Sequence, residues 1–288
     1  MVKTALIVLN YNDFSTTANF LNHIKNFDSI SKIIVVDNNS PDGSFTRLLK
    51  LKSDKIDVIK SNRNGGYAYG NNFGINYAIQ EYKPKYLVIS NPDVIFKEEI
   101  LEIITKTFEK NNKIALISPF MKDSLKPAWR LLNWNQEIFY LIFHLFEFNQ
   151  LFSCPVSYRL DYLKGYNRFV DVLPGSFFIA KCEIFQEIGL FDEITFLYYE
   201  EEIIAYKIRK NGYKNLLMGK LEYIHDHSIT INKNYSFFKK TKLLFESKLI
   251  FYKYYQKINQ KQIILLRFLL LLSLLKMTII FSLKKKLK

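Results

Sequence analysis

The sequence predicts an α/β fold with a largely parallel sheet, followed by a basic helical extension. Short apolar runs rich in β-branched residues alternate with helical segments, which is the pattern of strands joined by crossover helices. Charge divides the chain near residue 230: 27 Lys and Arg face 26 Asp and Glu before it, and 14 face a single acid after it. We therefore expect an α/β domain over residues 1–230 and a helical, membrane-associating region over 231–288.

Apolar runs that stop at turn residues predict the strands, and segments with helical character lie between them. The expected strands are 4–9, 32–36, 55–59, 86–89 and 114–118, with a later strand at 213–218 and an apolar run at 221–224. The expected helices are 14–26, a segment that ends near residue 80, and 97–110. This order predicts helices on the faces of a sheet whose strands run mostly in parallel.

Composition bounds the class of protein. A chain of 288 residues with 49% hydrophobic content can bury a sizeable core. Its two cysteines, Cys154 and Cys182, make no metal-ligand spacing, and so low a cysteine content suits a reducing compartment. The first apolar run is too short for a signal peptide and has no small-residue cleavage site, so we expect a cytoplasmic protein.

Polar residues follow three of the expected strands at the point where each strand ends. They are Asn10 and Tyr11 after the first strand, Asp37 after the second, and Asn91 with Asp93 after the fourth. Asn, Asp and Pro are ordinary turn formers, so each stretch alone is also consistent with a plain turn. Ligands of open α/β sheets bind beyond the carboxyl ends of the strands, so together these residues predict a binding site at that edge.

The segment NRNGGYAYGNNFG at 62–74 is rich in glycine and asparagine. As a phosphate loop it is a weak signal, because it does not follow the first strand of the fold. Asn64, Gly65 and Gly66 begin it, and glycine allows a ligand to approach the backbone closely.

Taken in order, these motifs resemble those of the family 2 glycosyltransferases, the inverting enzymes of the GT-A fold, and particularly the rhamnosyltransferase-like bacterial members. The matching stretches are VLNYN, VVDNNSPDGS, NRNGGYAYGNNFG, ISNPDV, LPGSFFIAK, IGLFDEITFLYYEEE, KIRKNGY and YIHDHSIT. The resemblance spans about residues 3 to 230. It implies a Rossmann-like sheet sandwiched by helices, a nucleoside-diphosphate sugar donor (UDP- or dTDP-linked) and a divalent cation, Mn²⁺ or Mg²⁺.

The resemblance also implies roles for the residues at the strand ends. Asp93 becomes the metal-binding carboxylate, with Asn91 facing the nucleotide. Asp37 becomes the carboxylate that reads the base. Asn10 and Tyr11 flank the nucleotide, and the backbone at Asn64, Gly65 and Gly66 approaches it. Gly175 and Ser176 become a turn that lines the acceptor pocket.

Three consecutive glutamates, Glu200 to Glu202, begin an expected helix. Acidic residues in a first turn also simply complement the helix dipole. The resemblance makes one of them the catalytic base, and counting back from Gly212 favours Glu201, with Glu200 in reserve. The sequence departs from the common Glu-Asp pattern here, so the register stays open by one residue.

His225 and His227 share a face of a strand, where one of them could complete a metal site. A lone histidine is more often structural. The resemblance places a metal-binding or diphosphate-facing histidine in this motif, which favours His225 over His227. Imidazole with carboxylate suits Mn²⁺ somewhat better than Mg²⁺.

The tail combines positive charge with long apolar side chains. Residues 236–260 have the period of a basic amphipathic helix, although Lys240 and Lys248 fall on its apolar side. Residues 263–283 are long enough to cross a bilayer, but Arg267 and Lys276 interrupt them, so spanning stays open. The run 134–152 is either an ordinary buried helix or a second membrane-facing segment. We expect peripheral attachment to the anionic cytoplasmic face of the inner or plasma membrane.

The sequence thus predicts transfer of a sugar to a glycan or lipid-linked acceptor in bacterial surface polysaccharide synthesis. Two alternatives belong to other classes: a non-catalytic sugar-nucleotide-binding or membrane scaffold protein, and a nucleic-acid-binding protein. The basic tail carries aliphatic side chains instead of stacking-spaced aromatics, so we expect no nucleic acid as partner. A homo-oligomer is left open.

Overall fold

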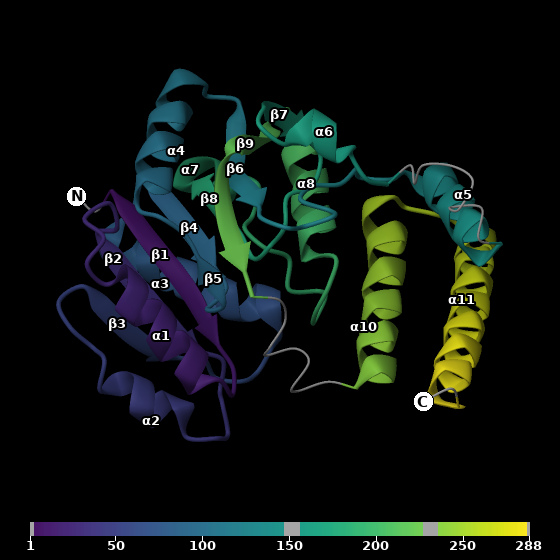
Figure 1. The fold of residues 1–288 in the computed structure, drawn as a ribbon, viewed down its shortest axis with the longest axis horizontal. Coiled ribbons are helices and arrows are strands. Elements are labelled where there is room, and N and C mark those ends of the chain that lie inside the picture. Colours follow the sequence, from purple (N-terminus) through teal and green to yellow (C-terminus); the bar gives the residue numbers. More distant parts are fainter. Residues whose placement is uncertain (1–2, 147–155, 227–235, 287–288) are drawn as a thin grey trace.

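The structure, a computed structural model, describes residues 3–146, 156–226 and 236–286. Its centre is a sheet in which the strands follow the order β3-β2-β1-β4-β8-β6-β9-β5, and β7 pairs with β9. The strands are β1 (Thr4–Asn10), β2 (Lys32–Asp37), β3 (Ile56–Lys60), β4 (Tyr86–Ser90), β5 (Val94–Ile95), β6 (Ile114–Met121), β7 (Asn167–Val170), β8 (Phe177–Lys181) and β9 (Lys214–His225). Figure 1 shows the helices arranged around this sheet, with the C-terminal helices at one side.

The helices cover both faces of the sheet. The helices of the described residues are α1 (Phe14–Ile24), α2 (Ser44–Leu49), α3 (Tyr67–Tyr82), α4 (Glu99–Lys110), α5 (Trp134–Leu145), α6 (Leu160–Leu163), α7 (Cys182–Glu187), α8 (Glu200–Lys210), α10 (Phe237–Ile250), a π-helical turn η2 (Phe251–Tyr255) and α11 (Gln260–Lys286). Buried side chains of α1, α2 and α4 form one apolar core with one face of the strands. Those of α3, α7 and α8 form a second core on the other face.

Strand alternation explains the two cores. In β1, Leu6 and Val8 belong to the first core, whereas Ala5 and Ile7 belong to the second. Successive side chains of a strand point to opposite faces, so a strand buried on both sides must be apolar throughout. The continuous apolar runs of the sequence therefore become central strands.

The predicted α/β fold with helices on both faces of the sheet is confirmed, and part of the sheet is antiparallel. Strands β3, β2, β1 and β4 pair in parallel. Strand β8, which directly follows the expected acceptor turn, lies antiparallel between β4 and β6. The predicted strand at 213–218 and the apolar run at 221–224 form one strand, β9, whose pairing with β6 shifts register midway.

The C-terminal helices pack against the α/β domain. Phe251 and Tyr252 of η2 and Leu266 of α11 are buried in a third apolar cluster with Tyr199 and Ile203 at the start of α8. The predicted helix over 236–260 is present over Phe237–Tyr255 as α10 followed by η2, and it ends earlier than predicted, because the chain turns at Lys257, whose φ is +53°. Part of its apolar side packs against protein in this cluster. The domain boundary at residue 230 lies outside the described residues.

Candidate active site

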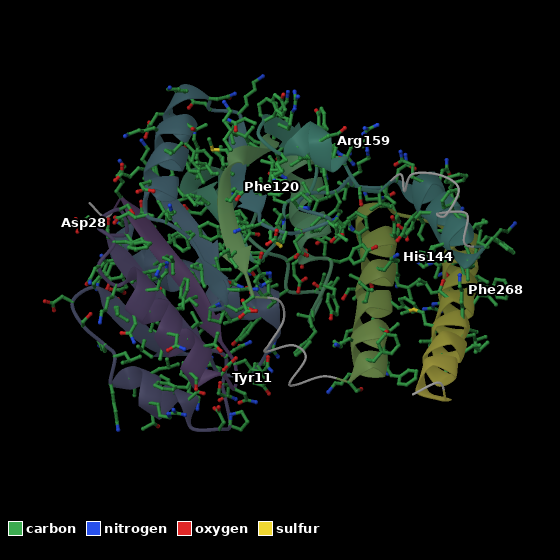
Figure 2. The ribbon with its side chains drawn as sticks, in the orientation of Figure 1. Tyr11, Asp28, Phe120, His144, Arg159 and Phe268 are labelled. Carbon is green, nitrogen blue, oxygen red and sulfur yellow. The ribbon has the colours of Figure 1, made fainter. Side chains whose placement is uncertain are left out.

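The ends of β1 and β2 form one buried polar cluster. Asn10 and Asp37 are opposite each other in the parallel ladder and are both fully buried. Asn10 Nδ2 donates to Asp37 Oδ2 at 2.8 Å, and Ser40 N donates to Asp37 Oδ1 at 2.9 Å. The structure thus brings two predicted site residues together, and the role of Asp37 toward a base stays a prediction. Tyr11 follows at the half-buried end of β1 (Figure 2).

The glycine-rich segment joins this cluster to a second loop. Asn38 Nδ2 donates to Asn64 Oδ1 and to the carbonyl of Gly66, both at 3.1 Å. Gly66 has a φ of +94°, and a Cβ there would lie 2.0 Å from the Phe196 carbonyl oxygen. A Cβ on Gly65 would lie 2.4 Å from Cγ of the Tyr69 ring. Glycine is therefore required at Gly66 to let the loop approach the segment that precedes α8.

Asp93 and His225 meet at the end of β4. The short strand β5 pairs antiparallel with β9 so that Val94 is opposite His225, which brings the histidine beside the preceding aspartate. His225 Nε2 lies 3.1 Å from Asp93 Oδ1, and both side chains are largely buried. The Asp93 carbonyl accepts the backbone N–H of Asp226 at 2.9 Å, which fixes the turn.

This pair fits a divalent cation. A carboxylate oxygen and an imidazole nitrogen 3.1 Å apart have the spacing of two adjacent ligands on one ion with bonds of about 2.0–2.2 Å. In the part of the chain that the structure describes, no group of three or more His, Cys, Asp and Glu side chains converges. The remaining ligands would come from a substrate or from elsewhere in the chain. The predicted ligand His227 lies outside the described residues.

Gly175 and Ser176 connect the β4 end to the glutamate triplet. The N–H of Asn91 donates to the Ser176 carbonyl at 2.8 Å, and the N–H of Gly175 donates to Glu201 Oε1 at 3.2 Å. A Cβ on Gly175 would lie 2.8 Å from that same carboxylate oxygen. Ser176 Oγ is hydrogen-bonded to the Tyr223 hydroxyl at 2.9 Å, which anchors the turn on β9.

A strained turn positions the start of α8. Tyr198 and Tyr199 have φ values of +73° and +69°, in a region that non-glycine residues rarely adopt. Such conformations persist only where the surroundings hold them, and they concentrate at functional sites. The Tyr199 ring is buried against Phe251 of η2, at 5.6 Å between centroids, and Ser247 Oγ donates to the Leu197 carbonyl at 2.8 Å.

The three glutamates differ in their surroundings. Burial, and then the charge of Glu201, raises the pKa of Glu200 well above its usual range, and Glu200 Oε1 has no hydrogen-bond partner among the described residues. Burial, and then the charge of Glu202, raises the pKa of Glu201 to about 7. A carboxyl group with a pKa near 7 is matched to general-base catalysis at neutral pH.

Glu202 and Tyr67 also lie in this region. The sequence analysis included Glu202 only as the third glutamate of the triplet and did not single out Tyr67. Glu202 Oε1 accepts the indole N–H of Trp129 at 2.9 Å, and Glu202 borders a cavity of about 180 Å³ that Trp129 and Tyr140 also line. Tyr67 donates its hydroxyl to the Gly175 carbonyl at 2.7 Å. Burial raises the pKa of Tyr67, with further contributions from the charges of Glu201, Glu200 and Asp93. The position of Tyr67 directly after Gly65-Gly66 is the one signal that could have indicated it.

The predicted residues that the structure describes therefore lie in one connected region. The β1–β2 cluster is linked through Asn38 and Gly66 to the loop before α8. The end of β4 is linked through Ser176 and Gly175 to Glu201. The arrangement places a candidate cation site and a candidate base on two sides of one turn.

Comparisons with known proteins identify the family. The profile of glycosyl transferase family 2 matches residues 5–172. The low-salt glycan biosynthesis hexosyltransferase Agl10 of Haloferax volcanii is 28% identical over 230 residues, which cover 76% of this chain. The chain spans 65% of the length of that relative.

Solved structures share the fold at low sequence identity. The mannosyltransferase PcManGT from Pyrobaculum calidifontis, in complex with GDP-Man and Mn²⁺, has a TM-score of 0.58 at 14% identity, covering 90% of this chain and 65% of its own. S. aureus TarS 1–349 with UDP-GlcNAc has a TM-score of 0.55 at 14% identity, and the match covers 86% of this chain and 65% of that chain. GalNAc-T7 with UDP, GalNAc and Mn²⁺ has a TM-score of 0.57 at 15% identity, and the match covers 78% of this chain and 44% of that chain. Because the family profile covers more than half of the chain and the sheet has the matching fold, the protein belongs to glycosyl transferase family 2.

Proposed function

We propose that the protein is an inverting, metal-dependent glycosyltransferase. It transfers a hexosyl or deoxyhexosyl group from a UDP- or dTDP-linked sugar to a hydroxyl of a glycan or lipid-linked acceptor. The observation that carries the proposal is the connected turn, in which the Asp93–His225 contact at the end of β4 and the Glu201 carboxylate are joined through Gly175 and Ser176.

The donor occupies the end of the sheet formed by β2, β1 and β4. Asp37, Asn10 and Tyr11 lie on the nucleoside side, and Asn91 with Asp93 lies on the diphosphate side. The order β2-β1-β4 supports this assignment, because it makes the ends of these three strands adjacent. Gly65 and Gly66 allow the backbone to approach the nucleotide without a side chain between them.

Glu201 is the base of the reaction. Its carboxylate accepts the proton of the acceptor hydroxyl while that oxygen forms a bond to the anomeric carbon of the donor sugar. The bond from the anomeric carbon to the diphosphate oxygen breaks with its electron pair leaving on the phosphate. One displacement inverts the anomeric configuration. The pKa of about 7 leaves a large fraction of Glu201 ionised at neutral pH, whereas burial raises the pKa of Glu200 well above its usual range and makes it the weaker candidate.

Asp93 and His225 would hold the cation, which when bound neutralises negative charge on the departing diphosphate. His227 is the alternative imidazole ligand. The acceptor lies on the side of Gly175 and Ser176, toward the cavity beside Glu202.

The relatives support the donor class and the cation. One is named a hexosyltransferase of glycan biosynthesis, and the solved structures contain Mn²⁺ with GDP-Man or with UDP, or contain UDP-GlcNAc. We extend the proposal to a role in bacterial surface polysaccharide synthesis at the cytoplasmic membrane face, with the C-terminal region as a peripheral attachment.

A screen of sugar nucleotides tests this function. Purified protein is incubated with UDP-, dTDP- and GDP-sugars, with Mn²⁺, Mg²⁺ or EDTA, and release of the nucleoside diphosphate is measured. We expect turnover of a UDP- or dTDP-sugar that requires the cation, and an inverted anomeric centre in the product by NMR. Binding of a sugar nucleotide without any turnover would favour the non-catalytic scaffold instead, and turnover unaffected by EDTA would contradict metal dependence.

A further inference from the structure

The helix α11 has two opposite faces, one buried and one exposed. Ile263, Leu266, Leu269 and Leu270 are buried in the third apolar cluster. The opposite strip is apolar and exposed, and consists of Ile264, Phe268, Leu271, Leu275 and Ile279. At 100° per residue these five side chains fall within an arc of about 80°. The buried face is apolar because it packs in the protein core. Among the described residues nothing covers the exposed strip.

The neighbouring helix α5 also has an exposed apolar face. Phe139, Ile142 and Phe146, at the end of the helix, follow the i, i+3, i+7 spacing of one helix face and are all exposed, Phe146 by 68%. Lys276 Nζ of α11 donates to the carbonyls of His144 at 2.9 Å and of Leu145 at 3.1 Å, and so ties the two helices together at the C-terminus of α5. Figure 2 shows His144 beside α11 and Phe268 at the outer edge of the molecule.

Length and composition alone allow the segment Gln260–Ile279 of α11 to cross a membrane, with 22% of it buried inside the protein. The packing argues against crossing. Leu266 is fully buried against protein, so α11 cannot cross the lipid without losing that packing. Lys276 ties the C-terminal half of α11 to the end of α5, so the two helices meet lipid together. A helix with one face on protein and the opposite face apolar is instead suited to the plane of a membrane interface.

Charge identifies the surface that this strip fits. Lys261 and Arg267 are exposed on α11, the first at the N-terminal end of the strip and the second on its flank. The sequence adds lysines at 284, 285, 286 and 288, within a tail that has 14 basic residues and one acid. Cations beside an apolar strip favour anionic lipid, because long basic side chains place their charge at the headgroups.

We propose that α5 and α11 form a two-helix wedge that embeds in the surface of an anionic bilayer with α11 parallel to the membrane plane, so that the protein does not span the membrane. The wedge comprises the eight exposed apolar side chains of α5 and α11 named above. This inference rests on the membrane attachment in the proposed function and adds its geometry and the participation of α5. The consequence is a defined orientation of the α/β domain at the membrane, since Leu266 of α11 is buried in the same apolar cluster as Tyr199 and Ile203 at the start of α8.

Vesicle flotation with the full chain tests the attachment. Vesicles of phosphatidylglycerol and phosphatidylcholine are compared with pure phosphatidylcholine. We expect the wild type to float with the anionic vesicles, and the variants Phe268→Glu and Phe146→Glu each to lower the partition coefficient about tenfold or more, given the apolar area lost. Phe169→Glu, at an exposed phenylalanine of β7 outside the wedge, is the matched control and should float as the wild type does.

Labelling depth distinguishes a parallel from a crossing helix. Cysteine variants at Ile264, Leu271 and Ile279, in a Cys154→Ser background, carry a fluorophore quenched by lipids brominated at known depths. Cys182 is buried, and its thiol pKa is raised to about 11 by burial, so it does not compete for the label. Equal shallow depths at the three positions support the proposal, whereas a deep Leu271 between two shallow ends would establish a spanning helix and overturn it.

Two further results would also overturn the inference. The first is wild-type protein that stays out of anionic vesicles at low salt while it still turns over a sugar nucleotide, which refutes the wedge and leaves the proposed function intact. The second is a dimer in light scattering that Phe268→Glu dissociates without any vesicle binding, which would assign the strip to a second copy of the chain. Unchanged melting temperatures of the glutamate variants exclude misfolding as the cause.

Discussion

Among single residues, Glu201 is central to the proposed chemistry. Its pKa of about 7 has a physical cause, since burial and the neighbouring Glu202 disfavour its charged form. We predict that Glu201→Gln lowers turnover by about 10²–10⁴-fold, the usual contribution of a general base, while donor affinity changes little.

The pH profile checks this prediction. A base must be deprotonated to act, so the wild-type kcat should fall as pH falls through about 7, by about tenfold per unit below it. The residual activity of Glu201→Gln should lack that limb. Glu200→Gln is the matched comparison, and the assignment is off by one residue when that variant is inactive and Glu201→Gln retains activity.

Gly66 provides a second prediction for a single residue. Its φ of +94° and ψ of −172° belong to a region that only glycine populates readily, and a Cβ would meet the Phe196 carbonyl oxygen at 2.0 Å. Gly66→Ala should therefore lower donor affinity and the melting temperature together. Gly43 is the control, because its φ is +78° but no atom lies within 4 Å of the position that a Cβ would take. Gly43→Ala should cost only about 1–2 kcal/mol and spare donor binding. Equal effects at the two glycines would refute the close approach.

Among the secondary-structure elements, a buried ion pair joins α5 to α10. Lys248 Nζ is hydrogen-bonded to Glu137, which also accepts the Tyr252 hydroxyl at 3.0 Å, and both charged side chains are buried. Removal of one partner leaves an uncompensated buried charge, so Lys248→Met should destabilise the protein by about 3–5 kcal/mol.

Chemical denaturation measures the free energy of unfolding of these variants. The double variant Lys248→Met, Glu137→Leu should recover most of the lost stability, because no buried charge remains. Lys242→Ala breaks an exposed pair with Glu246 in the same helix, 3.8 Å apart, and should change the unfolding midpoint little. A similar loss from Lys242→Ala and Lys248→Met would show that the burial of the pair has no energetic role.

The sequence predicted the elements with local signals and missed those that depend on distant partners. The strands β1 to β4 and the polar residues at their ends follow from apolar runs and turn residues. The antiparallel insertion of β8 does not, because an apolar strand carries no mark of its direction or of its neighbours. Lys248 interrupts the apolar side of the predicted amphipathic helix. Its position could not be explained from the sequence, because its partner Glu137 is 111 residues away.

In the candidate site, too, local signals were predictable and contacts between distant residues were not. Asp93 could be singled out as a carboxylate after a strand, and the family resemblance implied its metal-binding role, which stays a prediction. The contact between Asp93 and His225 depends on the pairing of β5 with β9, and the bond from Trp129 to Glu202 joins residues 73 apart. No periodicity or local motif encodes either contact.

In the molecule as a whole, the C-terminal region is part of the folded body. Phe251, Tyr252 and Leu266 cover Tyr199 and Ile203, which begin the helix of the glutamate triplet. We therefore predict that deletion of residues 231–288 exposes this apolar surface and yields an aggregated protein, whereas a tail that only attaches to membranes would leave a soluble domain. Size-exclusion chromatography of the truncated chain decides between them, and a monodisperse, active fragment would contradict the packing described above.

Cation binding at the end of β4 provides the most direct test of the proposed active site. Titration of Mn²⁺ in the presence of UDP or dTDP, followed by electron paramagnetic resonance, is carried out on the wild type, Asp93→Ala, Glu201→Gln and Asp54→Ala, the last an exposed control in the loop before β3. We predict that the wild type, Glu201→Gln and Asp54→Ala bind the ion with the nucleotide, and that Asp93→Ala loses this binding and all transfer while it melts as a folded protein. Asp93→Ala that binds Mn²⁺ and nucleotide as tightly as the wild type would contradict the proposed metal site.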